Sequence, residues 1–182
     1  MNVSTALRQA RLRAGLDQRD LGRRVGYSPQ MVSAVEKGVR ELAPDVRLSI
    51  AELLDDPDLY LALAEEATGG VMVPAVLDGP RVDLHRVATG VKLAEEATEV
   101  LAVWASWKSV TSRPGSPEER HNAKVYAHQV YELLTACGVT LAVLCREYGL
   151  SPAELAREHL AELRAKGYAA KEGAKRDAKG AA

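Results

Sequence analysis

The stretch Arg23–Gly38, RRVGYSPQMVSAVEKG, restricts the fold of this chain more than any other segment. Gly26 ends one short helical run, because glycine adopts the left-handed conformation that other residues resist. Ser28 is a preferred N-cap residue, and Pro29 loses no hydrogen bond at the first position of a helix. The pattern therefore predicts two short helices joined by a tight turn.

The second of these helices is suited to contact an anionic or polar surface. Leu21, Val25, Val32 and Val35 are spaced to form a small core between the two helices. The first turn of the second helix then points outward, and its amides have no partner within the helix. Amides at this positive end of the helix dipole suit phosphate groups or base edges.

The composition favours helices and does not exclude nucleic acid as a partner. Hydrophobic residues make up 47% of the 182 residues, but aromatics only 4%, and Phe is absent, so Leu, Val and Ala must form the core. The net charge of −1 conceals a segregation of charge. Residues 1–48 hold nine Lys/Arg against five Asp/Glu, residues 49–70 hold six acids and no base, and the tail from Arg164 holds six bases against two acids. Nucleic-acid binding responds to such local charge.

Helix signals predict an all-α protein with two helical domains. In the N-terminal domain, residues 1–67, five helices are expected over 3–14 (with Ser4 or Thr5 as N-cap), 17–26, 28–37, 44–54 and 58–67. Glycines and prolines mark residues 68–80 as a linker. Helices over 83–110, 117–137, 140–148 and 152–166 form the C-terminal domain, residues 81–168. The low-complexity basic tail, residues 169–182, is predicted to be disordered.

Residues 16–38, LDQRDLGRRVGYSPQMVSAVEKG, resemble the helix-turn-helix of the lambda-repressor-like, or XRE-type, bacterial and phage regulators. The shared features are Gln18 at the start of the motif's first helix, a small residue within that helix and a glycine at the turn. A capped recognition helix then ends in Glu36-Lys37-Gly38. The resemblance covers about residues 3–60 and implies a five-helix DNA-binding domain.

The resemblance also implies a role for each residue of the motif. Gln18 would hydrogen-bond a phosphate and hold the recognition helix in register. Gln30, Met31 and Ser33 would face base edges in the major groove, with Ser28 near the DNA backbone. Gln30 is the candidate for direct readout, because glutamine pairs bidentately with adenine. The cations that would neutralise phosphates, setting affinity and salt dependence, are Arg19, Arg23, Lys37 and Arg40.

Two positions depart from the family pattern. Pro29 stands where many relatives carry a polar base-reading residue, which shifts the reading of bases to its neighbours. Gly22 replaces a more usual alanine, at a cost of up to about 1 kcal/mol in helix propensity. Neither departure breaks the motif.

A Gly-x-Ser-Pro spacing recurs in VLCREYGLSPAELAREH, residues 143–159. The second helix of this repeat carries Glu154 and Glu158, which phosphate groups would repel. We therefore predict a structural helical corner here, with a second DNA contact as the alternative.

The C-terminal helices carry the heptad-like apolar spacing of helix pairs. Two helices of this kind predict an antiparallel hairpin whose apolar face is partly core and partly a surface for oligomerisation. A homodimer would present two recognition helices about 34–36 Å apart on a pseudo-palindromic site. The spaced residues are Leu93, Ala97, Val100, Trp104 and Trp107 on one helix, and Ala123, Tyr126, Val130, Leu133 and Cys137 on the next.

The sequence indicates no catalytic site, no metal site and no cofactor. No phosphate loop, nucleophile elbow or pair of catalytic carboxylates is present. Asp78, Asp83 and His85 lie close together in the sequence, and a metal or catalytic site there is the less favoured alternative. His121 and His128 lie seven positions apart on one helical face, with no acidic or thiol ligand at matching positions.

The leading hypothesis is a non-enzymatic transcriptional regulator, a repressor of bacterial or phage origin that binds double-stranded DNA. No signal peptide or membrane-spanning run of about 18 residues is recognised, and Cys137 and Cys145 are expected to be reduced thiols, so a cytoplasmic location is predicted. The alternative is an antitoxin-like component whose C-terminal domain binds a protein partner.

Overall fold

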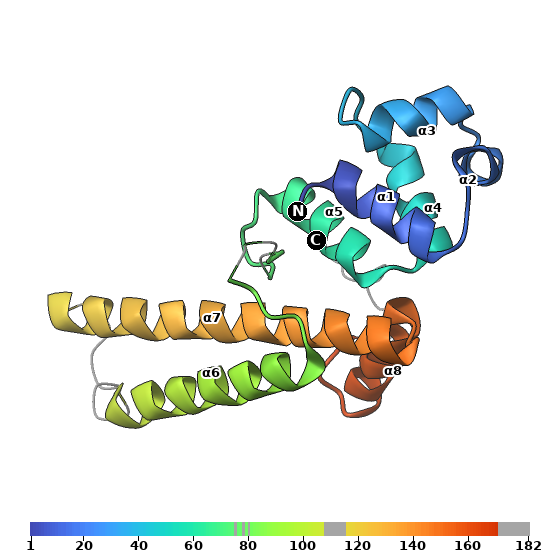
Figure 1. Ribbon diagram of the computed structural model, residues 1–182. Coiled ribbons are helices and arrows are strands. Elements are labelled where there is room, and N and C mark those ends of the chain that lie inside the picture. Colours follow the sequence, from blue (N-terminus) through green and yellow to red (C-terminus); the bar gives the residue numbers. More distant parts are fainter. Residues whose placement is uncertain (75, 78, 80, 108–115, 171–182) are drawn as a thin grey trace, which may run out of the picture.

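The computed structural model describes residues 1–74, 76–77, 79, 81–107 and 116–170, which form eight α-helices and no strand (Figure 1). The predicted all-α fold is confirmed. Of the tail predicted to be disordered, residues 171–182 lie outside the described residues.

The first five helices surround one hydrophobic core. They are α1 (Val3–Arg13), α2 (Gln18–Val25), α3 (Pro29–Glu36), α4 (Pro44–Leu54) and α5 (Pro57–Thr68). The largest fully buried side chains of this core are Leu7, Leu21, Val32, Val35, Ile50 and Leu59. The predicted core between the two short helices is therefore present, with Val25 packed at its edge.

The first helix begins at Val3, within the predicted range, but its N-cap differs from the prediction. Asn2, and not Ser4 or Thr5, is the N-cap of α1, and its Oδ1 accepts a hydrogen bond from the Thr5 amide at 2.9 Å. Val3 is already helical and is buried in the core. Burial of this apolar side chain favours a helix that starts before the two hydroxyl residues.

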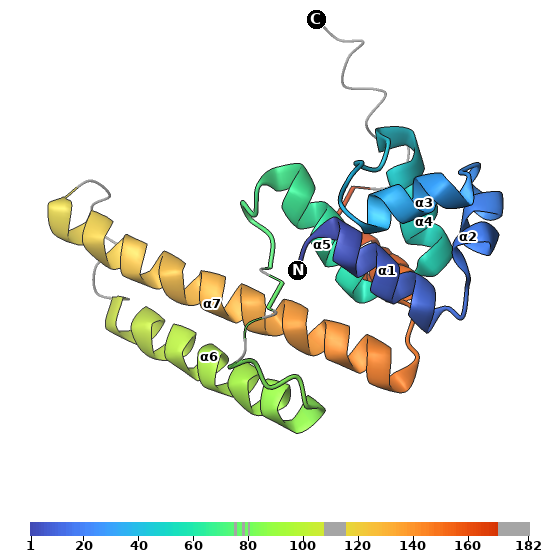
Figure 2. The same ribbon diagram turned by 45° about the horizontal axis from the view of Figure 1, so that its top comes forward.

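The next two helices form a long antiparallel hairpin that extends away from the five-helix unit in both views (Figures 1 and 2). They are α6 (Arg86–Trp107) and α7 (Pro117–Tyr148), and α8 (Pro152–Ala165) follows. Thr140 Oγ1 donates to the Thr89 carbonyl at 3.1 Å, and the rings of Trp104 and Tyr126 meet with centroids 5.7 Å apart. These two contacts fix the register of the hairpin.

A single helix, α7, replaces the two helices that the sequence predicted before and after Gly138. A Cβ at Gly138 would lie 2.5 Å from the Cβ of Pro74, which belongs to the segment between α5 and α6. Gly138 is therefore a notch that receives Pro74, and the helix continues through it. Glycine weakens a helix by only about 1 kcal/mol, so packing along α7 overrides its local preference.

Acidic residues at the start of α5 join the five-helix unit to α7 and α8. Asp56 Oδ1 and Oδ2 accept hydrogen bonds from Arg13 of α1, each at 2.7 Å. Asp58 pairs with Arg13 at 3.1 Å and with Arg146 of α7. Asp55 Oδ1 accepts from the amide of Ala153, in the first turn of α8, at 3.1 Å. We call Asp55, Asp56 and Asp58 the acidic junction, and it accounts for three of the six acids in residues 49–70.

The hydropathy of α7 was not anticipated from the sequence. Within the described residues, α7 is the one helix that is long and apolar enough to cross a membrane, by length and composition alone. An 18-residue window of this helix has a mean hydropathy of 1.3. Only 22% of that window is buried. In the fold, α7 packs against α6 and α5.

Candidate DNA-binding surface

The corner between α2 and α3 has the geometry that its sequence predicts. Gly26 ends α2 in the left-handed conformation, with φ 73° and ψ 20°. The Ser28 side chain accepts a hydrogen bond from the Met31 amide at 3.1 Å, and Pro29 is the first residue of α3. The corner lies at the end of the five-helix unit remote from the α6–α7 hairpin (Figures 1 and 2).

Gly22 has a steric role that helix propensity alone does not reveal. A Cβ at this position would lie 2.3 Å from the carbonyl oxygen of Tyr27, which follows the turn. The Tyr27 amide donates to the Gly22 carbonyl at 2.8 Å, and Tyr27 Oη accepts from the Ala43 amide at 3.2 Å. Glycine therefore permits the close approach of the turn to α2, in return for its propensity cost.

A nearly buried ionic network holds α3 against α1 and α2. Glu36, at the end of α3, accepts hydrogen bonds from Arg11 Nε at 2.6 Å and Nη2 at 3.0 Å. Gln18 Nε2 donates to the same carboxylate at 2.8 Å. The side chains of Arg11 and Glu36 are only 8% and 3% exposed. Burial by itself would raise the pKa of Glu36, but the hydrogen bonds from Arg11 and Gln18 hold it below its ordinary value.

Arg11 is not among the predicted site residues, because it carries no base-reading or phosphate-binding signal of its own. The signal was available, since Arg11 lies between Leu7, Ala10 and Ala14 on the predicted apolar side of the first helix. A charged residue in such a position requires a buried partner. Glu36 supplies that partner, so the residue that closes the motif also orients the recognition helix.

The recognition helix borders a shallow groove of about 560 Å³ that faces solvent. The groove brings together five predicted residues from two helices, and adds Ala34 and Val39 to them. Gln30 is exposed, and Ser33 is half-buried. The lining residues are Gln18, Pro29, Gln30, Ser33, Ala34, Lys37 and Val39.

Met31 lies apart from this groove. Its sulfur accepts a hydrogen bond from Arg40 Nη1 at 3.3 Å, beyond the turn that follows α3. At about 100° per residue, Met31 is turned about 160° from Ser33 around α3. Its predicted contact with bases stays a prediction, and this contact would come from the edge of α3 next to Arg40.

The predicted phosphate-binding cations are all exposed. Arg19 and Arg23 project from α2, and Arg23 also pairs with Asp20 at 3.2 Å. Lys37 and Arg40 follow α3. Arg24 is a further exposed cation on α2, and it is not among the predicted phosphate-binding residues. Residues 18–40 hold five Lys/Arg against Asp20 and Glu36, and Glu36 is already paired, so this surface is basic.

The residues predicted for oligomerisation divide into two groups. Leu93, Val100 and Tyr126 are half-buried within the hairpin, as is Ala97 at its edge. Trp104 and Val130 are each 41% exposed. The side chain of Trp107 lies outside the described residues.

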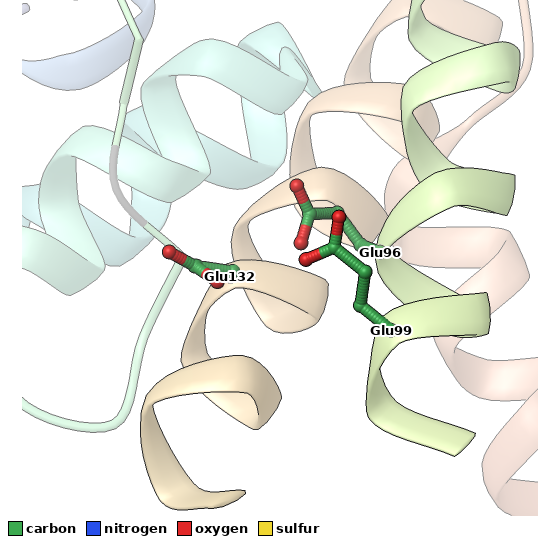
Figure 3. Close-up of side chains that lie close together, drawn as sticks. All are labelled: Glu96, Glu99 and Glu132. Atoms are coloured by element: carbon green, nitrogen blue, oxygen red, sulfur yellow. The ribbon is translucent and has the colours of Figure 1, made fainter. Parts of the chain in front are cut away.

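Three carboxylates on the hairpin approach one another. Oxygens of Glu96, Glu99 and Glu132 lie within 4.8 Å of one another (Figure 3). The Lys92 ammonium is 2.6 Å from Glu96, and Gln129 donates to Glu132 at 2.8 Å. A cation and an amide already offset part of this negative charge.

The residues set aside as metal or catalytic candidates have local roles or are exposed. Asp83 accepts from the His85 amide at 2.9 Å, and His85 Nδ1 accepts from the Val87 amide at 3.3 Å, so both residues shape the turn before α6. His121 and His128 are exposed on α7. Asp78 lies outside the described residues.

The comparisons with known proteins bear on the first five helices. Residues 7–58 match a family model described as helix-turn-helix. No curated protein and no solved structure matches the chain.

Proposed function

Residues 7–58 form a lambda-repressor-like helix-turn-helix domain, a DNA-binding unit of transcriptional regulators, and from this premise we propose that the chain is a transcriptional repressor. It acts as a dimer on a pseudo-palindromic operator in double-stranded DNA, in a bacterium or phage. The observation that carries the proposal is the solvent-facing groove along α3, where Gln18 and Gln30 meet beside exposed cations.

The proposed contacts divide into reading and positioning. Gln30 and Ser33 face base edges when the first turns of α3 enter the major groove, and Gln30 selects adenine. Gln18 contacts a phosphate while Glu36 holds its amide group. The cations that anchor the DNA backbone are Arg19, Arg23, Lys37 and Arg40.

The Arg11–Glu36–Gln18 network supports this function by fixing α3 before DNA arrives. A recognition helix whose orientation is already set loses less conformational freedom on binding. We infer a purely binding role, without catalysis or cofactor, in the cytoplasm.

Binding of a fluorescent duplex from the chain's own promoter, followed by anisotropy and footprinting, tests the proposal. A protected pair of half-sites is expected. Gln30→Ala should lower affinity roughly tenfold for the preferred operator, since one bidentate contact to a base contributes about 1–3 kcal/mol. It should change affinity little for a duplex in which the base pair read by Gln30 has been replaced. Lys37→Ala should weaken every duplex alike and reduce the salt slope by about 1. Equal loss on all sequences for Gln30→Ala would reduce Gln30 to a backbone contact, and an unprotected promoter would remove the operator proposal.

An antitoxin-like role is the second candidate, and one observation favours it. A groove of about 910 Å³ lies between α4 and α5 on one side and α7 and α8 on the other. Apolar side chains such as Leu48, Leu61 and Leu141 line it, with Asp55 and Arg157 among the polar residues. Co-expression with the adjacent gene product tests this role: a complex that Leu48→Glu disrupts would support it, and a chain that purifies alone would not.

A further inference from the structure

Glu96 is a nearly buried carboxylate in the contact between α6 and α7. Its neighbours along α6, Leu93 and Val100, are apolar and half-buried within the hairpin. Glu96 is only 5% exposed. A carboxylate with so little access to water is costly unless partners satisfy its charge and both of its oxygens. Its partners therefore need to be identified atom by atom.

One oxygen of Glu96 has a partner and the other has none. Lys92 Nζ lies 2.6 Å from Oε1. Oε2 is shielded from solvent, and no donor among the described residues reaches it. Lys92 lies one helical turn before Glu96 and is itself exposed, so it compensates the carboxylate from one side only. Oε2 is thus an atom that requires a further ligand.

Gln129 of α7 presents a second buried oxygen of this kind. Its Nε2 donates to Glu132 at 2.8 Å. The Oε1 atom of the same amide is shielded from solvent and accepts no hydrogen bond from the part of the chain that the structure describes. Exchanging the two amide atoms would not satisfy it, because an oxygen would then face the Glu132 carboxylate. Two buried oxygens, one from each helix, therefore require a positive partner.

Carboxylate oxygens from both helices gather at this place. One oxygen each of Glu96, Glu99 and Glu132 lies within 4.8 Å of the other two. Glu96 and Glu99 project from α6, and Glu132 projects from α7 (Figure 3). Residues three apart are neighbours on a helix surface, and both Glu96 with Glu99 and Gln129 with Glu132 have this spacing. Each helix therefore supplies one pair of oxygen-bearing side chains, and we call these four residues the oxygen cluster.

The charge and the spacing of the oxygen cluster fit a divalent cation. Three carboxylates beside the single ammonium of Lys92 leave two negative charges. Oxygens within 4.8 Å of one another fit in one coordination sphere with a radius of about 2.3–2.6 Å, which is that of Ca²⁺. Carboxylate and amide oxygens are ligands of hard cations, whereas zinc and copper favour the nitrogen and sulfur ligands that the cluster lacks.

We propose that the oxygen cluster binds one hard divalent cation, with Ca²⁺ the best fit by radius, and that this ion ties α6 to α7. Glu96 Oε2 and Gln129 Oε1 are its buried ligands. Glu99 and Glu132, which are exposed, close the site on the solvent side, and water completes the six or more oxygens of the shell. Lys92 stays on Glu96 Oε1 and orients that carboxylate, as hydrogen-bonding partners of metal ligands do. The ion stabilises the hairpin and takes no part in a reaction.

The ligands of this site are far apart in the sequence. Glu99 and Gln129 are the closest two from different helices, and they are 30 positions apart. The sequence motifs for metal sites have short, fixed spacings, so the sequence predicted no metal site, and the proposal revises that prediction. The oxygen cluster lies on the hairpin, remote from the corner between α2 and α3 (Figure 1). The proposal therefore stands or fails independently of DNA binding.

Titration of the full chain with CaCl₂, MnCl₂ and MgCl₂ tests the site. The chain is first treated with EDTA and dialysed, and calorimetry is run in about 0.15 M KCl to screen diffuse attraction. One Ca²⁺ per chain is expected, with a dissociation constant of about 10⁻⁴ M or lower. Calcium at about 100 times this constant should raise the midpoint of thermal unfolding by about 5 °C. Mg²⁺ should bind roughly tenfold more weakly, because it demands a smaller, near-octahedral shell.

Substitutions that remove one carboxylate separate the oxygen cluster from the surrounding acids. Glu99→Gln and Glu132→Gln change exposed side chains, so the fold should persist by circular dichroism, and each should weaken Ca²⁺ binding roughly tenfold or more. Glu96→Gln should weaken it at least as much. Glu95→Gln is the matched control, because Glu95 is exposed on the same helix and lies 3.7 Å from Lys92, but is not in the cluster. It should change the affinity by no more than about twofold.

The outcomes are distinct. A chain that binds none of the three ions at about 1 mM overturns the proposal. Equal weakening by Glu95→Gln and Glu99→Gln also overturns it, because the ion would then be attracted to an acidic surface without a defined site. Tighter binding of Mn²⁺ than of Ca²⁺ that depends on Glu96 and Glu99 supports the site and assigns it to manganese.

Discussion

The molecule contains two corners with the same capping chemistry and different surroundings. Gly26 and Gly149 both end a helix in the left-handed conformation, with φ 73° and 64°. Ser28 and Ser151 both cap the following helix, accepting from the amide three residues on at 3.1 and 3.0 Å. A proline occupies the first position of each following helix.

The difference lies in what the first turn of the second helix meets. In α8 the Ala153 amide donates to Asp55 of the acidic junction, and Glu154 stands in the same turn. In α3 the first turn carries no acid and borders the solvent-facing groove. Capping residues thus determine that a helical corner forms, whereas the charge around the corner determines what its second helix contacts. The prediction that residues 143–159 form a structural corner agrees with this contact.

The largest expected effect comes from the network that fixes the first corner. Glu36→Ala leaves the Arg11 guanidinium buried without its carboxylate, which should lower the free energy of unfolding by about 3–5 kcal/mol in urea titrations. Replacing both residues, as Arg11→Met with Glu36→Leu, should restore much of that loss. The exposed Glu41→Ala is the control. A loss below about 1 kcal/mol would show that the network contributes no more than a surface ion pair.

The same network predicts a pH dependence. The pKa of Glu36 is lowered in the folded chain, so its contribution to stability is present above the unfolded value of about 4.3 and is lost as the pH falls through the folded value. Glu36→Gln should therefore flatten the loss of stability below about pH 4.3. Urea midpoints of both proteins from pH 7 to pH 3 measure this, and parallel curves would contradict it.

The next prediction concerns the acidic junction, which holds the α7–α8 corner against the five-helix unit. Asp58→Ala removes the carboxylate that pairs with Arg146 and one of the two that pair with Arg13, and should lower the free energy of unfolding by about 2 kcal/mol. Because the contacts with α7 are weakened, thermal unfolding should also become less cooperative. Glu66→Ala, which removes the more exposed pair with Arg47, should change stability by less than about 1 kcal/mol. Equal losses of stability for the two substitutions would show that the acidic junction contributes no more than an exposed ion pair.

A matched pair of glycine substitutions sharpens the comparison. A Cβ at Gly26 or Gly149 would meet no atom within 4 Å, so each alanine adds only the strain of a positive φ, about 1–2 kcal/mol. The two stability losses should be alike by calorimetry. Operator affinity should fall for Gly26→Ala alone, and a matching fall for Gly149→Ala would make the α7–α8 corner a DNA contact.

The caps give the smallest effect. Ser28→Ala and Ser151→Ala should each lower stability by about 1 kcal/mol, because each leaves one first-turn amide without its acceptor. Anisotropy should detect weaker operator binding for Ser28→Ala only. Loss of binding in both variants at matched stability would remove the distinction between the corners.

The features that could be predicted from the sequence are those that depend on a residue and its near neighbours. The turn glycine, the caps at Asp17 and Ser28, and the proline that opens α3 follow from preferences of single residues and their neighbours. Long-range packing decided the rest. Gly138 was interpreted as a break because Pro74 lies 64 positions away in the chain, and Arg11 was overlooked because its partner lies 25 positions away. The acidic junction depends on contacts across 88 and 98 positions, which no periodic pattern contains.

The 32 residues of α7 have a mechanical consequence, because they make an unbroken rod of about 48 Å. One end is fixed by Asp58 and Arg146 beside the five-helix unit, and the other is the tip of the hairpin. A rotation of about 5° at the fixed end moves the tip by about 4 Å, more than two residues of helical rise. A slight change in packing at Asp55 or Asp58 of the acidic junction therefore produces a larger displacement at the tip of the hairpin, tens of ångströms away.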